Sequence, residues 1–263
     1  MVDFVHVGPH RTASSKIWEI LNNTEEIKLS DKVKETDFFL SDNYEHKIIS
    51  EFGRSDGRLV GEFGMGYFAN LYAGQRIYRH NKNCKIIIGV RNPVERLLSL
   101  LQHYYSTGKI SSDFEVELVN SPVFIESGRY ASHIRWWVRS FGEKNVFLFN
   151  YGNFNDNPEN EIYRMFKFLG LNEIIFENYN LTQKKGSAEI PRNRILSLMA
   201  MKTAHFLRRA GLHQFVNRLR DIGLKRMLAQ KKKIVFPNEL CNTLNDIYEE
   251  DITYLDQHIK DLV

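Results

Sequence analysis

Cysteine, long apolar runs and low-complexity segments are scarce or missing in this 263-residue sequence. Its two cysteines, Cys84 and Cys241, provide neither a disulfide framework nor the spacing of a zinc site, so a reducing cytoplasm is expected. No run of about 18 apolar residues occurs, which argues against a membrane-spanning helix. A strand-like apolar pattern begins at Phe4, so no signal peptide is expected. The length fits one α/β domain, and we predict a single domain over 1–263.

Acidic residues are scarce in one part of the chain. Residues 184–233 contain 14 Lys and Arg residues but only Glu189 and Asp221 as acids, whereas the whole chain has a net charge of only +4. Such a block predicts an anionic partner: a phosphorylated cofactor, an acidic glycan, lipid head groups or nucleic acid. Apolar spacing predicts two basic helices there, about 193–210 and 213–230. They form a lid over an anionic acceptor, rest weakly on an anionic membrane, or are simply solvated.

The N-terminal stretch FVHVGPHRTASSKIWEI predicts a buried strand, a tight loop and a helix. Apolar residues at 4, 5 and 7 suit a strand, Gly8-Pro9 interrupts it, and apolar residues at 17, 20 and 21 share one helix face. Such a loop directs backbone N–H groups and a helix N-terminus at one place, which suits an anion. Arg11 can add positive charge, and Ser14 and Ser15 can add hydroxyl donors.

This loop differs from the G-x-x-x-x-G-K-[ST] pattern of nucleoside triphosphatases. Its second glycine is replaced by Ala13, and the lysine position is Ser14. On this stretch alone, a phosphate loop without the usual lysine and an ordinary strand-to-helix turn are equal alternatives.

A second strand is predicted over Leu59–Phe63, with Glu62 near its carboxyl end. Ligands bind beyond such ends in open α/β sheets, although a solvated glutamate before a glycine turn is the plain alternative. His6, His10 and His103 are competing candidates for a catalytic base, and each fits a structural role or a minor contact better.

The clearest strand is Lys85–Arg91, a continuous apolar run typical of a parallel sheet buried on both faces. Asn92 can cap the helix that follows, with Pro93 at its first position and Ser99 off its leucine face. Arg91 therefore lies at a strand end beside a helix N-terminus. Arg91 and this helix N-terminus form a second arrangement that suits an anion. The alternative is that Arg91 only forms an ion pair on the surface.

The remaining chain predicts helices and one more strand. Residues 22–58 are irregular and are predicted only as helices and loops near the mouth of a site. A helix ending at Gly142, a strand over Asn145–Tyr151, a helix from Asn157-Pro158 to Gly170, and a last helix over about 238–260 follow. The predicted fold is a P-loop-like, three-layer α/β sandwich with a central parallel sheet and a mostly helical C-terminal region.

Several of these motifs resemble the sulfotransferases that use 3′-phosphoadenosine 5′-phosphosulfate (PAPS). FVHVGPHRTASSKIWEIL is similar to their 5′-phosphosulfate loop, and IIIGVRNPVERLLSLLQHYYSTG is similar to their 3′-phosphate segment. GEFGMGYF resembles the E-K-[ST]-P-x-Y-F stretch of the Golgi-type carbohydrate branch. SGRYASHIRWWVRSFGEKNVFLFNYGNF and FKFLGL resemble a later helix–strand unit and helix end. The pieces follow the family's order over almost the entire chain.

The resemblance implies a role for each matching residue. Glu62 and Arg11 would be catalytic, with Glu62 as the base. A basic loop at Lys184 would close over the cofactor, and Arg91 and Ser99 would hold its 3′-phosphate. The implied cofactor-binding residues are Gly8, Pro9, His10, Arg11, Thr12, Ala13, Ser14, Ser15, Arg91, Ser99, Tyr130, Lys184, Lys185, Gly186 and Ser187.

The chain also departs from the family pattern. Arg11 stands where the loop usually has lysine, and Phe63 replaces the lysine that usually follows the base, so one cationic contact is missing. Arg11 can neutralise charge on the departing phosphate but is a poor proton donor, because its pKa is above about 12.

We therefore predict a PAPS-dependent sulfotransferase that acts on a hydroxyl, with an amine as second choice, of a carbohydrate or polar small molecule, natural products included. No metal is required, because sulfuryl transfer depends mainly on positioning and charge stabilisation. Two other classes stay open. A P-loop nucleotide kinase or triphosphatase predicts a Walker lysine and a magnesium aspartate. A non-catalytic nucleic-acid-binding protein would use residues 184–233 and would not need Glu62 or Arg91.

Overall fold

The structure is a computed structural model that describes residues 1–54, 56–171 and 234–260, together with 189–191, 199, 203 and 229–231. The chain divides into two compact units. The first comprises Met1–Arg96, Ile125–Gln183 and Asn245–Val263, and the second comprises Leu97–Phe124 and Lys184–Leu244. The first unit contains the central sheet and most of the predicted site residues. The assignment of the whole chain to a single domain stays a prediction.

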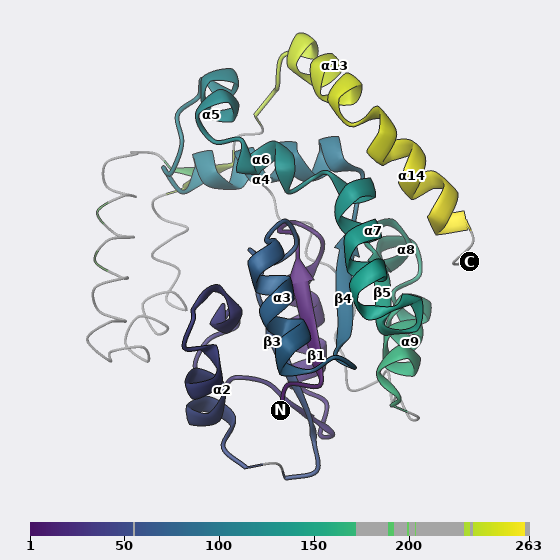
Figure 1. Cartoon of the computed structure of the whole chain (residues 1–263). Coiled ribbons are helices and arrows are strands. Elements are labelled where there is room, and N and C mark those ends of the chain that lie inside the picture. The colour runs from purple at the N-terminus through teal and green to yellow at the C-terminus, as the bar shows by residue number, and fades with distance from the viewer. Residues whose placement is uncertain are drawn as a thin grey trace. The chain divides into compact units, whose positions relative to one another are not determined.

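A five-stranded parallel sheet forms the centre of the first unit (Figure 1). Its strands, in spatial order, are β2 (Ile27–Lys28), β3 (Leu59–Phe63), β1 (Phe4–Gly8), β4 (Lys85–Val90) and β5 (Val146–Asn150). All the pairings within it are parallel, so the carboxyl ends of the strands share one edge. The chain leaves β1 toward β2 on one side and leaves β4 toward β5 on the other. Open α/β sheets bind ligands at such a switch point.

Helices cover both faces of this sheet, because successive strand residues point to opposite sides and both sides are apolar. Val5, Ile86 and Ile88 belong to the core of one face. The helices that contribute to that core are α2 (Tyr44–Phe52), α3 (Leu71–His80), α7 (Tyr130–Phe141) and α14 (Glu249–Lys260). The helices on the opposite core are α1 (Ser14–Asn22), α8 (Tyr151–Asp156) and α9 (Pro158–Leu169). This three-layer α/β sandwich confirms the predicted fold class.

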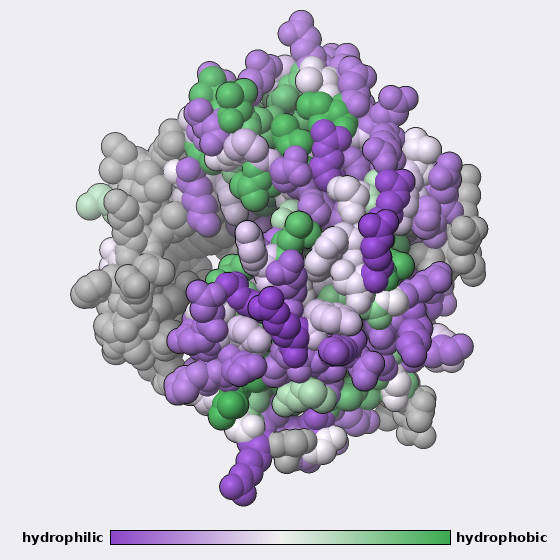
Figure 2. Space-filling view, in the orientation of Figure 1, coloured by the Kyte–Doolittle hydropathy of each residue, from purple (hydrophilic) through white to green (hydrophobic). Residues whose placement is uncertain are grey.

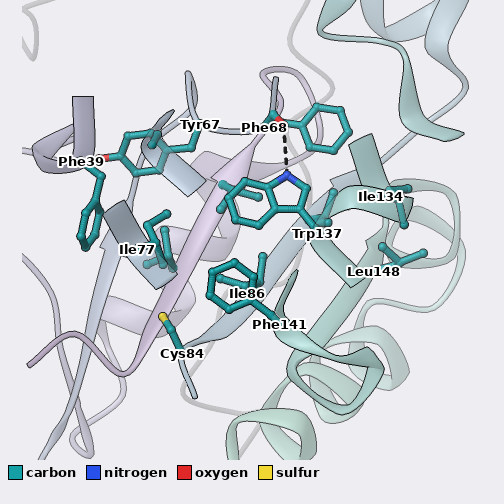
Figure 3. Close-up of a cluster of buried hydrophobic side chains, with 14 of the residues drawn as sticks. Phe39, Tyr67, Phe68, Ile77, Cys84, Ile86, Ile134, Trp137, Phe141 and Leu148 are labelled. Atoms are coloured by element: carbon teal, nitrogen blue, oxygen red, sulfur yellow. Dashed lines mark hydrogen bonds between the residues drawn. The ribbon is translucent and has the colours of Figure 1, made fainter. Parts of the chain in front are cut away.

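Trp137 lies at the centre of the first core (Figure 3). Its indole is fully buried, and Nε1 donates a 3.0 Å hydrogen bond to the Phe68 carbonyl. At Gly74 of α3, an added Cβ would lie 2.3 Å from the Trp136 ring, so glycine permits the close approach of α3 and α7. Packing in the core, rather than stacking on a ligand, is the role that this position gives to Trp137.

Local signals set the helix ends. The Asn92 side chain accepts a 3.1 Å hydrogen bond from the Glu95 N–H at the start of α4 (Pro93–Ser106). Asn157 accepts from the Asn160 N–H at the start of α9, also at 3.1 Å. Gly170 ends α9 with a φ of +86°, which glycine adopts without steric cost. These predicted boundaries are confirmed.

The prediction of a single last helix over about 238–260 is wrong. The segment forms two helices, α13 (Asn238–Ile247) and α14, with a turn at Tyr248. Tyr248 is fully buried, and its hydroxyl donates a 2.8 Å hydrogen bond to the Ile125 carbonyl. Arg129 donates to the Ile247 carbonyl, which a continuous helix would use internally. These tertiary contacts interrupt an apolar spacing that is otherwise helical.

The described part of the second unit includes most of α4, α5 (Phe114–Asn120) and a two-stranded antiparallel pair, β6 (Glu189–Pro191) and β7 (Ala229–Lys231). Hydrophobic side chains gather in the region of α5 in Figure 2. The loop at 184–187 and most of the two basic helices predicted within 193–230 lie outside the described residues. No helix in the described part of the chain is long and apolar enough to cross a membrane.

Candidate active site at the carboxyl ends of the strands

The loop after β1 has a left-handed backbone at three positions. Gly8, Arg11 and Ala13 have φ values of +93°, +73° and +65°. Glycine is required at position 8 for a second reason, because a Cβ there would lie 2.7 Å from the Met65 carbonyl oxygen. Two residues other than glycine in this conformation store backbone strain, which is typical of binding loops.

The Thr12 side chain packs between this loop and the neighbouring strand β4. The side chain is fully buried, and its hydroxyl donates a 2.8 Å hydrogen bond to the Pro9 carbonyl. At Gly89 of β4, an added Cβ would lie only 2.2 Å from Thr12 Oγ1. The Thr12 side chain therefore braces the loop from inside, so a contact with a ligand would have to come from its backbone.

Helix α1 begins directly after the loop, at Ser14, and no side chain caps it. The N–H groups of its first turn and the positive end of the helix dipole favour an anion there. The hydroxyls of Ser14 and Ser15 each lie near Lys34 Nζ, at 3.0 and 3.2 Å. Lys34 comes from the irregular 22–58 segment, where the sequence predicts only helices and loops near the mouth of a site.

Glu62 is only 2% exposed and lies at the carboxyl end of β3. Its Oε1 accepts hydrogen bonds from the Thr36 hydroxyl (2.8 Å), the Phe38 N–H (3.1 Å) and the Tyr67 hydroxyl (2.5 Å). Burial raises the pKa of Glu62 to about 7, although these hydrogen bonds act in the opposite direction. Oε2 is buried without a hydrogen-bond partner among the described residues. One oxygen is thus fixed, and the other is available for a proton.

Asp37 is a second carboxyl group close to Glu62. Burial, with the negative charge of Glu35, raises the pKa of Asp37 to about 6. The charge of Asp37 in turn contributes to the raised pKa of Glu62. Neighbouring carboxyls with raised pKa values are typical of sites that move protons.

Arg91 is close enough to Arg11 to affect the pKa of Arg11. Arg91 follows β4, pairs with Glu95 at 3.2 Å, and lies over the Tyr151 ring at 4.4 Å. Partial burial and the positive charge of Arg91 lower the pKa of Arg11. Two like charges brought together at the strand ends favour an anion beside them. The structure therefore brings both predicted arginines to the edge of the sheet that carries Glu62.

A family model described as "Sulfotransferase domain" matches residues 72–256, which is well over half of the chain. The chain belongs to the sulfotransferase family. The matched range includes β4 and Arg91. The loop after β1 and Glu62 precede it, so the roles predicted for them in this sulfotransferase are not covered by the family match.

Proteins of similar sequence are also named as sulfotransferases. The human heparan sulfate glucosamine 3-O-sulfotransferase 3B1 is 28% identical over 138 residues, covering 47% of this chain and 34% of that protein. The bifunctional heparan sulfate N-deacetylase/N-sulfotransferase 1 of Caenorhabditis elegans is 24% identical over 196 residues, covering 67% of this chain and 23% of that protein. The chain thus spans about a third or less of the length of these relatives.

Solved structures share the fold of this sulfotransferase. A sulfotransferase from Alicyclobacillus acidocaldarius superposes with a TM-score of 0.61 at 18% identity, covering 82% of this chain and 96% of that one. The sulfotransferase domain from the curacin biosynthetic pathway superposes with a TM-score of 0.52 at 12% identity, covering 70% and 79%. At these identities, the comparison concerns the fold alone.

The other predicted cofactor-binding residues of this sulfotransferase are Tyr130, Ser99 and the loop at 184–187. Tyr130 is fully buried in the core, with its ring centroid 5.4 Å from that of Phe68. Ser99 lies in the second turn of α4, and His103 lies near the end of that helix, both in the second unit. Residues 184–187 lie outside the described residues. The cofactor contacts assigned to these positions stay predictions.

His6 is buried in the protein, and its contacts fit a structural role. Its fully buried ring stacks on Phe63 at a centroid distance of 4.9 Å, and its Nδ1 accepts a hydrogen bond from the Gly8 N–H at 3.2 Å. Burial and then the positive charge of Lys34 lower the pKa of His6 to about 3. His6 is therefore neutral at physiological pH and a weak base, which favours Glu62 for that role.

Proposed function

We propose that this protein transfers a sulfuryl group from PAPS to a hydroxyl of a carbohydrate or polar small molecule, with Glu62 as the base. One observation carries the proposal: the N-terminus of α1, two arginines and a buried glutamate converge at the carboxyl ends of β1, β3 and β4. The cationic groups suit the phosphates of the donor, and the glutamate suits the proton of the acceptor.

The residues fit this donor. Burial and then the charge of Arg91 lower the pKa of Arg11; the two guanidinium groups repel each other in the free protein, and a bound anion would relieve that repulsion. The loop Gly8 to Ser15 would hold the 5′ end, and Arg91 would hold the 3′-phosphate, while the contact assigned to Ser99 stays a prediction from the sequence. When bound, PAPS supplies the activated sulfuryl group.

Glu62 accepts the proton of the acceptor hydroxyl. Thr36, Phe38 and Tyr67 hold its Oε1, which leaves Oε2 for the proton. A base whose pKa is near 7 combines a substantial basic fraction with good proton affinity at neutral pH, and such catalysis typically contributes about 10²- to 10⁴-fold in rate. Arg11 and the N–H groups of α1 stabilise negative charge on the departing phosphate without donating a proton.

The acceptor is proposed by class. The names of the relatives include both O-sulfation and N-sulfation of heparan sulfate, which supports a carbohydrate. A glutamate base favours the hydroxyl, since a hydroxyl must lose its proton as its oxygen attacks. The free thiol of Cys84 supports the expected cytoplasmic location, which stays a prediction, as does weak contact with a membrane surface.

No observation favours the two alternative functions. The lysine position of a nucleotide kinase is Ser14, and β4 is followed by Arg91 rather than by a magnesium-binding aspartate. The basic block that a nucleic-acid-binding protein would use lies largely outside the described residues.

Calorimetry and mass spectrometry test the proposal. The protein should bind 3′-phosphoadenosine 5′-phosphate (PAP) and should bind ATP with Mg²⁺ far more weakly. With PAPS and a panel of sugars, glycans, amines and polar small molecules, an acceptor should gain the mass of one SO3 unit. Preference for ATP–Mg²⁺ over PAP would contradict the proposal, and sulfation confined to amines would move the acceptor from hydroxyl to nitrogen.

A further inference from the structure

We propose that Lys34 contacts the phosphosulfate end of the donor and supplies the cationic contact that the chain lacks at Phe63. This inference rests on the proposed function, and it concerns a residue outside the loop and outside every motif identified in the sequence. Lys34 Nζ lies 3.0 Å from Ser14 Oγ and 3.2 Å from Ser15 Oγ, so its ammonium group is at the first turn of α1. Its side chain is 23% exposed, which leaves it accessible to a ligand.

The position of Lys34 is fixed from both sides along the chain. Before it, the Ser30 hydroxyl donates a 2.6 Å hydrogen bond to Glu51 of α2. After it, the Thr36 N–H donates to the Phe63 carbonyl at 3.3 Å, and the Thr36 hydroxyl donates to Glu62. The segment from Lys34 to Phe38 therefore contacts the phosphate loop at one end and the proposed base at the other.

The charge of Lys34 is placed unfavourably for the protein alone. A helix N-terminus carries the positive end of the helix dipole, so a lysine there is repelled rather than attracted. Arg11 and Arg91 add two more cations at the same edge of the sheet. Glu35 offsets part of this charge, since its carboxylate lies 3.1 Å from Lys34 Nζ, but the Glu35 side chain is 35% exposed and such pairs are weak. A lysine at a helix N-terminus, at the same sheet edge as two arginines, indicates an anionic ligand.

The chemistry of an ammonium group suits this place. Lys34 has three N–H donors, and among the described residues its ammonium group contacts Ser14, Ser15 and Glu35. A phosphate oxygen that replaces Glu35 would leave both serine contacts intact. During transfer the acceptor oxygen forms a bond to sulfur, its proton passes to Glu62, and the bond between sulfur and the phosphate oxygen breaks. That phosphate oxygen keeps the electron pair, and the charge of Lys34 stabilises it.

The test compares Lys34→Met, Lys34→Gln and Lys34→Arg with Lys32→Met. Lys32 is a matched control, because it lies two residues away and pairs with Glu51, with a side chain that is 71% exposed. Titration calorimetry with PAP measures the contact without any turnover. We expect Lys34→Met to weaken PAP binding by about 10- to 100-fold, the usual worth of one charge-assisted hydrogen bond, and Lys34→Arg to recover most of it. Lys32→Met should bind PAP as the wild type does.

Lys34→Gln separates charge from positioning, since glutamine can donate to the serine hydroxyls but carries no charge. We expect it to behave like Lys34→Met, with a larger loss in single-turnover rate than in PAP affinity, because negative charge grows on the phosphate during transfer. Wild-type affinity and rate in Lys34→Gln or Lys34→Met would overturn the role of Lys34 and leave the proposed function standing. Failure of the wild type to bind PAP would overturn both.

Discussion

Glu62→Gln removes one charge from the centre of the site and keeps the shape of the side chain. The pKa of Glu62 rises from an ordinary 4.5 to about 7 in the folded protein, chiefly through burial. A carboxyl whose pKa is raised on folding adds stability below its unfolded pKa, and that contribution is lost as the pH rises through the folded value. The shift corresponds to about 3 kcal/mol, at roughly 1.4 kcal/mol for each pKa unit.

Urea unfolding at about pH 4.5 and about pH 8 measures this effect. The free energy of unfolding of Glu62→Gln, relative to the wild type, should increase by about 3 kcal/mol between the lower and the higher pH, because the variant has no carboxyl to ionise. The comparison uses a difference between two proteins, so ionisable groups that both share cancel. An equal pH dependence in the two proteins would refute the assignment of a raised pKa to Glu62.

The same variant tests catalysis. Its sulfation rate should fall by about 10²- to 10⁴-fold while PAP affinity is kept, and the wild-type kcat/KM should rise with pH up to about 7. Asp3→Asn is the matched control, since the Asp3 carboxylate accepts a 2.8 Å hydrogen bond from the Val60 N–H at the opposite end of the sheet. Asp3→Asn should keep the wild-type rate. Near-normal turnover in Glu62→Gln would remove Glu62 from the role of base.

Three further substitutions test the site. Arg91→Met should weaken PAP binding by about 10- to 100-fold in calorimetry while the melting temperature changes little, and unchanged affinity would exclude Arg91 from the donor site. Gly89→Ala places a Cβ 2.2 Å from Thr12 Oγ1, so it should shift the loop and lower PAP affinity; binding equal to the wild type would show that the loop does not depend on this contact. Tyr67→Phe removes a hydrogen bond that lowers the pKa of Glu62, so the pH–rate profile should move to higher pH, and a shift to lower pH would contradict the assignment.

Much of the fold could be predicted from local pattern. The continuous apolar run of β4, the cap at Asn92 and the helix end at Gly170 all depend on residues that are close in sequence. Glu62 could be placed at a strand end for the same reason. The break at Tyr248 could not be predicted, because it depends on contacts with Ile125 and Arg129, more than a hundred residues away.

The contacts around the proposed base were harder to predict. Lys34, Thr36 and Asp37 lie in a segment without helical or strand periodicity, so no pattern marks their side chains. Thr36 reaches Glu62 across 26 positions of sequence, and Lys34 reaches Ser14 across 20. Only the folded chain brings these residues together. One signal was present in the sequence. The lysines that the family usually has at positions 11 and 63 are missing, so a lysine from another part of the chain could take their place.

In the proposed mechanism, the short segment from Lys34 to Phe38 would couple donor recognition to acceptor activation, since Lys34 contacts Ser14 and the other end of the segment holds Glu62. An insertion or deletion within these five residues would disturb both halves of the reaction at once. Evolution of a new acceptor preference is therefore expected to spare this segment and to draw on surfaces that do not share its backbone. Engineering for altered acceptors should keep its length fixed for the same reason.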